Sequence, residues 1–177
     1  MKKLIYLFLC LSFVTNHAQS SKDLEFYGPV FQIEDADIQI DLNQDFKIDF
    51  DVADASSSTT DANRKFVTVA RHLQLHRASE LKNNEVKAVL VVHGSAIFDL
   101  FTHEEYATYH NEEGLKNPNY DLLTVLDKEG VDIVLCGQSA RSRNITREMM
   151  HPKVKLALSA MSMHVQLQKE NYTLIKL

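Results

Sequence analysis

The chain has 177 residues, which is room for one domain of ordinary size whose core needs no disulfide or metal to be stable. Charged residues make up 24% of the chain and its formal net charge is −5, so it lacks the broad positive field that collects nucleic acid or anionic lipid. We therefore expect no nucleic-acid partner. The chain has two cysteines, Cys10 and Cys136, so at most one internal disulfide is possible.

Residues 1–19 are typical of a secretory signal peptide. Lys2 and Lys3 form a positive start, an apolar stretch runs from Leu4 to Val14, and a polar cleavage region follows. The apolar stretch is too short to span a bilayer core of about 30 Å as a helix. We therefore expect a periplasmic or secreted protein with no membrane contact after signal cleavage. The alternative is a buried N-terminal helix.

Removal of this leader leaves Cys136 as the single thiol. Cys10 follows Leu9 inside the apolar stretch rather than a small residue, which argues against a lipidation site. An odd cysteine in an exported protein indicates either pairing between chains or a free reactive thiol. The alternative is an inert thiol that packs in the core as a small hydrophobe.

A polar N-terminal arm, residues 20–45, precedes the main domain at 46–177. Alternation over 38–42 predicts one short edge strand in the arm, and alternation over 46–52 predicts a strand with one polar face. Thr60 or Asp61 is placed to cap the helix that follows, which should end near 82–84. Its apolar stripe consists of Ala62, Phe66, Val69, Ala70 and Leu73.

The rest of the chain alternates strands with helices. A continuous aliphatic run at 86–92 is typical of a strand buried on both faces. We expect further strands at 131–136, 154–158 and 172–177, and helices at 104–111, 120–128, 139–150 and 159–170. This order predicts a three-layer α/β/α sandwich with a mainly parallel sheet of about five strands.

Cys136 ends a predicted buried strand just before a helix. Open parallel sheets place their sites at the carboxyl ends of strands, and a helix N-terminus there favours a thiolate over a thiol. Arg141 and Arg143 would act in the same direction, so we expect a reactive cysteine. The residues expected to line its substrate site are Gly94, Gly137, Gln138, Ser139, Arg141 and Arg143.

His93 follows the 86–92 strand and is the second catalytic candidate. If the two strands are neighbours, its imidazole could orient the thiol or shuttle a proton. The alternative is a histidine that only hydrogen-bonds at the end of a strand.

Other histidines suggest a metal site. His72 and His76 lie one helical turn apart, a spacing that can ligate zinc. The chain has no His-Glu-x-x-His motif, because Ala107 takes the place of the second histidine after His103, and it has no cysteine pair. We interpret these side chains as surface histidines and expect no metal and no cofactor.

The sequence resembles the DsrE/DsrF-like family. The resemblance lies in the runs at 87–94, 130–131, 135–139 and 154–177, and in Tyr27-Gly28-Pro29-Val30 of the arm, which is similar to exported members. It implies a three-layer α/β/α fold, a trimeric or hexameric homo-oligomer and, in the sulfur-trafficking members, a cysteine that carries sulfur as a persulfide. Cys136 stands at the matching position.

The first functional hypothesis is therefore an exported sulfur-transfer or sulfur-binding protein that uses Cys136 as a persulfide carrier between a donor and an acceptor protein. Whether it is an enzyme stays open. The alternative is a non-catalytic periplasmic oligomer that binds a small ligand or serves assembly at the same strand ends. A third hypothesis is a redox-sensing thiol that links two subunits.

Overall fold

The computed structural model describes residues 22–31, 33–41, 43–78 and 86–177. The expected signal peptide at residues 1–19 lies outside the described residues, and so does the expected helix end near 82–84. Within the described ranges, none of the helices is both long and apolar enough to cross a membrane.

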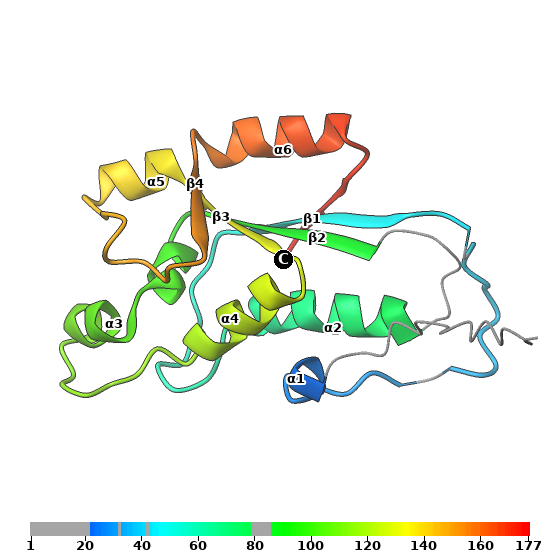
Figure 1. Cartoon of the computed structure of the whole chain (residues 1–177), viewed down its shortest axis with the longest axis horizontal. Coiled ribbons are helices and arrows are strands. Elements are labelled where there is room, and N and C mark those ends of the chain that lie inside the picture. Colours follow the sequence, from blue (N-terminus) through cyan, green and yellow to red (C-terminus); the bar gives the residue numbers. More distant parts are fainter. Residues whose placement is uncertain (1–21, 32, 42, 79–85) are drawn as a thin grey trace, which may run out of the picture.

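Five strands form one parallel sheet in the order β4-β3-β2-β1-β5. Their bounds are Phe46–Val52 for β1, Val86–Val92 for β2, Asp132–Cys136 for β3, Val154–Ala157 for β4 and Thr173–Lys176 for β5. The predicted three-layer sandwich is confirmed: α2 and α4 lie on one side of the sheet and α6 on the other (Figure 1).

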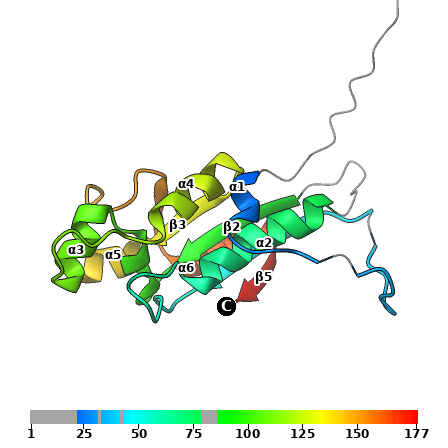
Figure 2. The ribbon, with the colours of Figure 1, turned by 90° about the horizontal axis from the view of Figure 1, so that it is seen from below.

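The helices differ in length and in what they cover. They are α1 (Lys22–Glu25), α2 (Arg64–Ala78), the 3₁₀ helix η1 (Ala96–Leu100), α3 (His103–His110), α4 (Tyr120–Lys128), α5 (Gly137–Ser142) and α6 (Ala160–Lys169). Figure 2 shows α1 beside α2 and α4, where Leu24 of the arm is 1% exposed in the core.

The central strand β2 explains why a continuous aliphatic run forms here. Ala88, Leu90 and Val92 point into the core under α2 and α4, whereas Val89 and Val91 point toward α6. Every one of these side chains is buried. A strand covered on both faces needs apolar residues at each position, as the sequence predicts.

Two local predictions about the first third of the chain are wrong. Residues 38–41 of the arm form no strand, and Leu42 lies outside the described residues. The cap of α2 is Asn63 rather than Thr60 or Asp61: its Oδ1 accepts a hydrogen bond from the backbone N–H of Lys65 at 2.9 Å. Asn63 serves because it is buried beside the helix end, while the two candidates lie in the preceding turn.

The helix after β3 is shorter than predicted and begins earlier. It starts at Gly137, directly after Cys136, and ends at Ser142 rather than near residue 150. Asn144 takes the left-handed backbone region with φ of 55°, and the N–H of Ile145 donates to the carbonyl of Ala140 at 3.0 Å, which closes the helix.

Candidate functional site

The carboxyl ends of β1, β2 and β3 lie side by side because these strands are neighbours in the sheet. Val92 of β2 is the register partner of Val52 in β1 and of Leu135 in β3. His93 directly follows Val92, and Cys136 directly follows Leu135, so the two residues occupy corresponding positions at adjacent strand ends. The structure therefore brings together the two sequence-predicted catalytic candidates.

Cys136 lies under the amino ends of two helices. Its side chain is 6% exposed and packs on the α6 face of the sheet with Val134 and Ala160. It is the N-cap residue of α5, and Ala160 is the first residue of α6. Helix amino ends carry unsatisfied N–H groups and a partial positive charge, so the sulfur lies where an anion is favoured.

Burial raises the pKa of the Cys136 thiol, but polar hydrogens around the sulfur lower it by more, so the net pKa lies below its ordinary value of 9.0. The groups that lower it are the backbone N–H groups of Ser139, Ala160 and Gln138 and the hydroxyl of Ser139. These groups favour the thiolate, which is the nucleophilic form of cysteine.

Two glycines allow the strand ends to approach each other. A Cβ on Gly137 would lie 2.4 Å from the carbonyl oxygen of Ala157, so only glycine lets α5 begin directly at the thiol beside β4. Gly94 has a φ of +59°, and a Cβ there would lie 2.4 Å from the carbonyl oxygen of Ala53. Gly94 and Gly137, both predicted to line the substrate site, thus allow close backbone contacts with neighbouring segments.

His93 is held by a carboxylate on the next strand. Its Nε2–H donates to Oδ1 of Asp51 at 2.7 Å, and its side chain is 32% exposed. Among the described residues, no hydrogen bond joins His93 to Cys136. In the neutral tautomer that fits the Asp51 contact, the ring proton is on Nε2 and Nδ1 is the ring nitrogen that can accept a proton.

A half-buried histidine from α6 lies beside this group. The Nδ1–H of His164 donates to Oδ2 of Asp49 at 2.7 Å, and its Nε2 lies 3.5 Å from Oδ1 of Asp51. Asp49 is 0% exposed. Burial raises the pKa of Asp49, while the hydrogen bond and the charge of His164 act against that rise.

Asp49, Asp51 and His164 are the site residues that sequence reasoning missed. The alternation of Asp49 and Asp51 along β1 indicates a solvated face, but His164 of α6 lies against it, and Asp49 is buried while Asp51 is half-buried. The available signal was His164, a histidine within the helix predicted at 159–170, because a buried carboxylate such as Asp49 needs a partner.

The polar residues around Cys136 divide into two groups. Ser139 lies next to the sulfur, and the Nε2 group of Gln138 donates to the carbonyl of Leu158 at 3.2 Å, which ties α5 to the segment before α6. Arg141 is exposed, and Arg143 turns toward the Phe98 ring, 6.0 Å from its centroid. The main groups that favour the thiolate are therefore backbone N–H groups and a hydroxyl.

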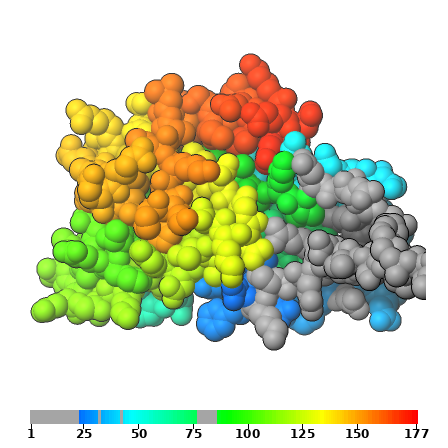
Figure 3. Space-filling view, viewed as in Figure 1, coloured from blue at the N-terminus to red at the C-terminus, as the bar shows by residue number. Residues whose placement is uncertain are grey.

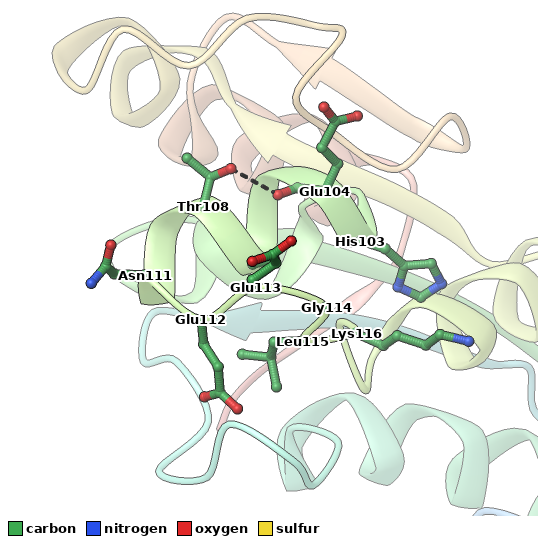
Figure 4. A pocket seen from close by; sticks show the side chains of 10 residues that line it. His103, Glu104, Thr108, Asn111, Glu112, Glu113, Gly114, Leu115 and Lys116 are labelled. Carbon is green, nitrogen blue, oxygen red and sulfur yellow. Dashed lines mark hydrogen bonds between the residues drawn. The ribbon is translucent and has the colours of Figure 1, made fainter.

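A pocket of about 650 Å³ lies elsewhere, along α3 and the following loop. Figure 4 shows Glu112 and Glu113 of this loop around it, with Thr108 donating to the backbone carbonyl of Glu104 at 3.0 Å. None of the sequence-predicted site residues lines it. Across the part of the chain that the structure describes, no group of three or more His, Cys, Asp and Glu side chains could hold a metal ion.

Comparisons with known proteins agree with this architecture. The model of the DsrE/DsrF-like family matches residues 50–177. A solved structure, the protein of unknown function MTH1491 from Methanobacterium thermoautotrophicum, is similar with a TM-score of 0.51 and 14% sequence identity. The match covers 75% of this chain and 100% of that one, and at this identity it supports the fold alone. No curated protein sequence matches the chain.

Proposed function

The chain belongs to the DsrE/DsrF-like family, and on this premise we propose that it is a sulfur-relay protein that carries sulfur as a persulfide on Cys136. The observation that supports this most directly is the place of the thiol between the amino ends of α5 and α6, where polar hydrogens hold its pKa below the ordinary value. The same polar hydrogens would also stabilise a persulfide anion on Cys136, because its negative charge lies at the same carboxyl end of β3.

The transfer consists of two exchange steps. The Cys136 thiolate attacks the outer sulfur of a donor persulfide, which forms a new S–S bond and breaks the donor's S–S bond, so the donor leaves as a thiolate. An acceptor thiolate then attacks the outer sulfur on Cys136 and releases the Cys136 thiolate. Each step moves one sulfane sulfur, and no external oxidant or reductant is needed.

His93 supplies the proton exchange that these steps require. Its Nε2–H bond to Asp51 fixes the ring, and the 32% exposure of its side chain gives solvent access. A proton taken up from an arriving thiol can pass through the ring to the leaving thiolate. Removing His93 should therefore slow transfer at neutral pH and leave the persulfide-carrying capacity of Cys136 unchanged.

The decisive experiment is persulfide loading followed by intact-mass measurement. After exposure to inorganic polysulfide, the wild-type protein should gain about 32 Da, the mass of one sulfur atom on the oxidation ladder of cysteine. Cys136→Ser should gain nothing. If the wild-type mass does not change, or if Cys136 resists iodoacetamide near neutral pH in the folded protein, the proposal is wrong.

We also propose that the protein is exported and forms a homo-oligomer. The pattern of residues 1–19 supports export. Apolar side chains along the outer side of α6 support self-association: Met161 is 77% and Val165 54% exposed, and Leu158 before the helix is 76% exposed. The orange and red segment that contains them forms one surface of the molecule (Figure 3). Light scattering of the purified protein should give a trimer or hexamer; a monomer at micromolar concentration would contradict this.

A further inference from the structure

The hydrogen-bonded pair of half-buried His164 and buried Asp49 stands out from the apolar contacts around it. Asp49 is 0% exposed, and the side chain of His164 is 14% exposed. Nδ1 of His164 donates to Oδ2 of Asp49 at 2.7 Å, and the other carboxylate oxygen, Oδ1, is buried without a hydrogen-bond partner among the described residues. An incompletely paired buried carboxylate destabilises a fold compared with apolar residues of similar volume.

The pair ties α6 to β1, whereas the apolar contacts of the helix with the sheet are small in number. Of the described residues of α6, Ala160 and Leu167 are the buried ones, and Met163 packs against them in part. His164 lies between Ala160 and Leu167 in the sequence. Its hydrogen bond to β1 is directional, unlike apolar contacts, so it determines how far the helix can slide or turn on the sheet.

The amino end of α6 is the part that reaches the thiol. Ala160 and His164 are four residues apart and therefore lie on the same side of the helix, about 6 Å apart along its axis. The N–H of Ala160 is one of the groups that favour the Cys136 thiolate. A shift of the helix that weakens the bond between His164 and Asp49 would move this N–H as well.

The same histidine also faces the partner of His93. Its Nε2 lies 3.5 Å from Oδ1 of Asp51, the oxygen that accepts from Nε2 of His93 at 2.7 Å. In the described part of the chain, Nε2 of His164 has no hydrogen-bond partner, so this 3.5 Å approach brings the two His–Asp pairs side by side beneath α6 without joining them by a hydrogen bond. His164 therefore lies near both proposed chemical groups: Ala160 of α6 packs against Cys136, and Asp51 lies between His164 and His93.

We propose that His164 and Asp49 are positioning residues for the Cys136 site: their hydrogen bond holds the amino end of α6 against the sulfur. This inference deepens the proposed function and rests on it for its biological meaning. The pair touches neither substrate nor sulfur, so its effect is on the pKa and reactivity of Cys136 and on the placement of α6.

The test compares the pH profile of Cys136 alkylation by iodoacetamide in the purified protein and its variants. His164→Ala removes the bond, so the apparent thiol pKa should rise and the rate at pH 7 should fall about three- to tenfold, since one pKa unit is a tenfold change in thiolate fraction. His164→Asn places an amide N–H close to the position of Nδ1 and should restore most of the wild-type rate. Gln166→Ala, an exposed change on the same helix, is the matched control.

A second variant keeps the test valid if His164→Ala fails to fold with Asp49 left buried and unpaired. Asp49→Val with His164→Leu removes both partners together, which avoids the unpaired carboxylate. Its thiol pKa should rise as in His164→Ala, and amide exchange in 158–164 should be faster than in the wild type. Wild-type alkylation and exchange in this double variant would overturn the inference.

The outcomes separate this inference from the proposed function. If the wild-type thiol pKa is low and His164→Ala leaves it unchanged, the positioning role is wrong while persulfide transfer stands. If His164→Ala raises the pKa but the wild type takes up no sulfur from polysulfide, the positioning role stands and the proposed function is wrong. If the wild-type thiol titrates as an ordinary cysteine, both are wrong.

Discussion

The two faces of the sheet are covered in different ways. Under α2 and α4, large side chains such as Phe66, Leu90 and Leu123 form the main apolar core and are fully buried. Under α6, the smaller cluster of Val89, Val91 and their neighbours is continued by carboxylates and imidazoles.

The two faces contribute differently: one supplies most of the apolar burial, and the other holds ionisable groups with shifted pKa values. The main core buries most of the apolar surface, which is the dominant favourable term in folding. The α6 face holds Cys136 and Asp49, whose ionisation equilibria are shifted in opposite directions from their ordinary values by burial and hydrogen bonding. Perturbed groups are common where a protein does chemistry, which supports our proposal that the face with less apolar packing carries the site.

The largest expected effect comes from emptying the main core. Phe66→Ala should lower the free energy of unfolding by about 3–5 kcal/mol, because it removes a fully buried aromatic ring next to strands that cannot close around the gap. Urea denaturation measures this. Gln166→Ala, an exposed change on α6, is the control and should change stability by less than about 0.5 kcal/mol. Equal losses from the two variants would break the contrast between the faces.

An intermediate effect is expected at Gly137, where α5 begins beside β4. Gly137→Ala should destabilise the protein by about 2 kcal/mol, because the new Cβ meets the backbone oxygen of Ala157 and overpacking of this kind strains its surroundings. It should also slow alkylation of Cys136 several-fold, since the first N–H groups of α5 must move. Lys155→Ala, an exposed change on the neighbouring strand β4, should leave both unchanged. A fully reactive Gly137→Ala protein would show that the close approach is unimportant.

The smallest effect is a pH dependence that belongs to the thiol. The folded-state pKa of Cys136 lies below its ordinary value of 9.0, so between these two values the unfolded state binds more protons than the folded state. Stability gained from the thiolate is therefore fully present above pH 9 and is lost as pH falls through the folded pKa, at about 1.4 kcal/mol for each unit of pKa difference.

Unfolding free energies of the wild type and Cys136→Ala, measured from pH 6 to pH 9, check this prediction. The difference between the two proteins should grow in favour of the wild type as pH rises. Parallel curves would mean that folding leaves the titration of Cys136 unchanged.

Most of the fold could be predicted because its signals are local. The aliphatic run at 86–92 and the alternation at 46–52 follow from which faces of β2 and β1 are covered. The helix that begins at Tyr120 ends at Lys128, before Gly130, as a left-handed glycine favours. The length of α5 could not be read in this way, because Asn144 and the turn at Ile145 end it.

The sequence by itself determined the order of strands and helices and pointed to Cys136, since both depend on residues that are close together in the chain. Only the tertiary structure decided what surrounds the thiol. Asp49 and His164 are 115 residues apart, and Asp49, on the face of β1 that looks solvated, is buried with His164 of α6 against it. A contact at that separation leaves no periodic trace in the sequence, so the groups that position and support the cysteine become visible only when the sheet and α6 are assembled.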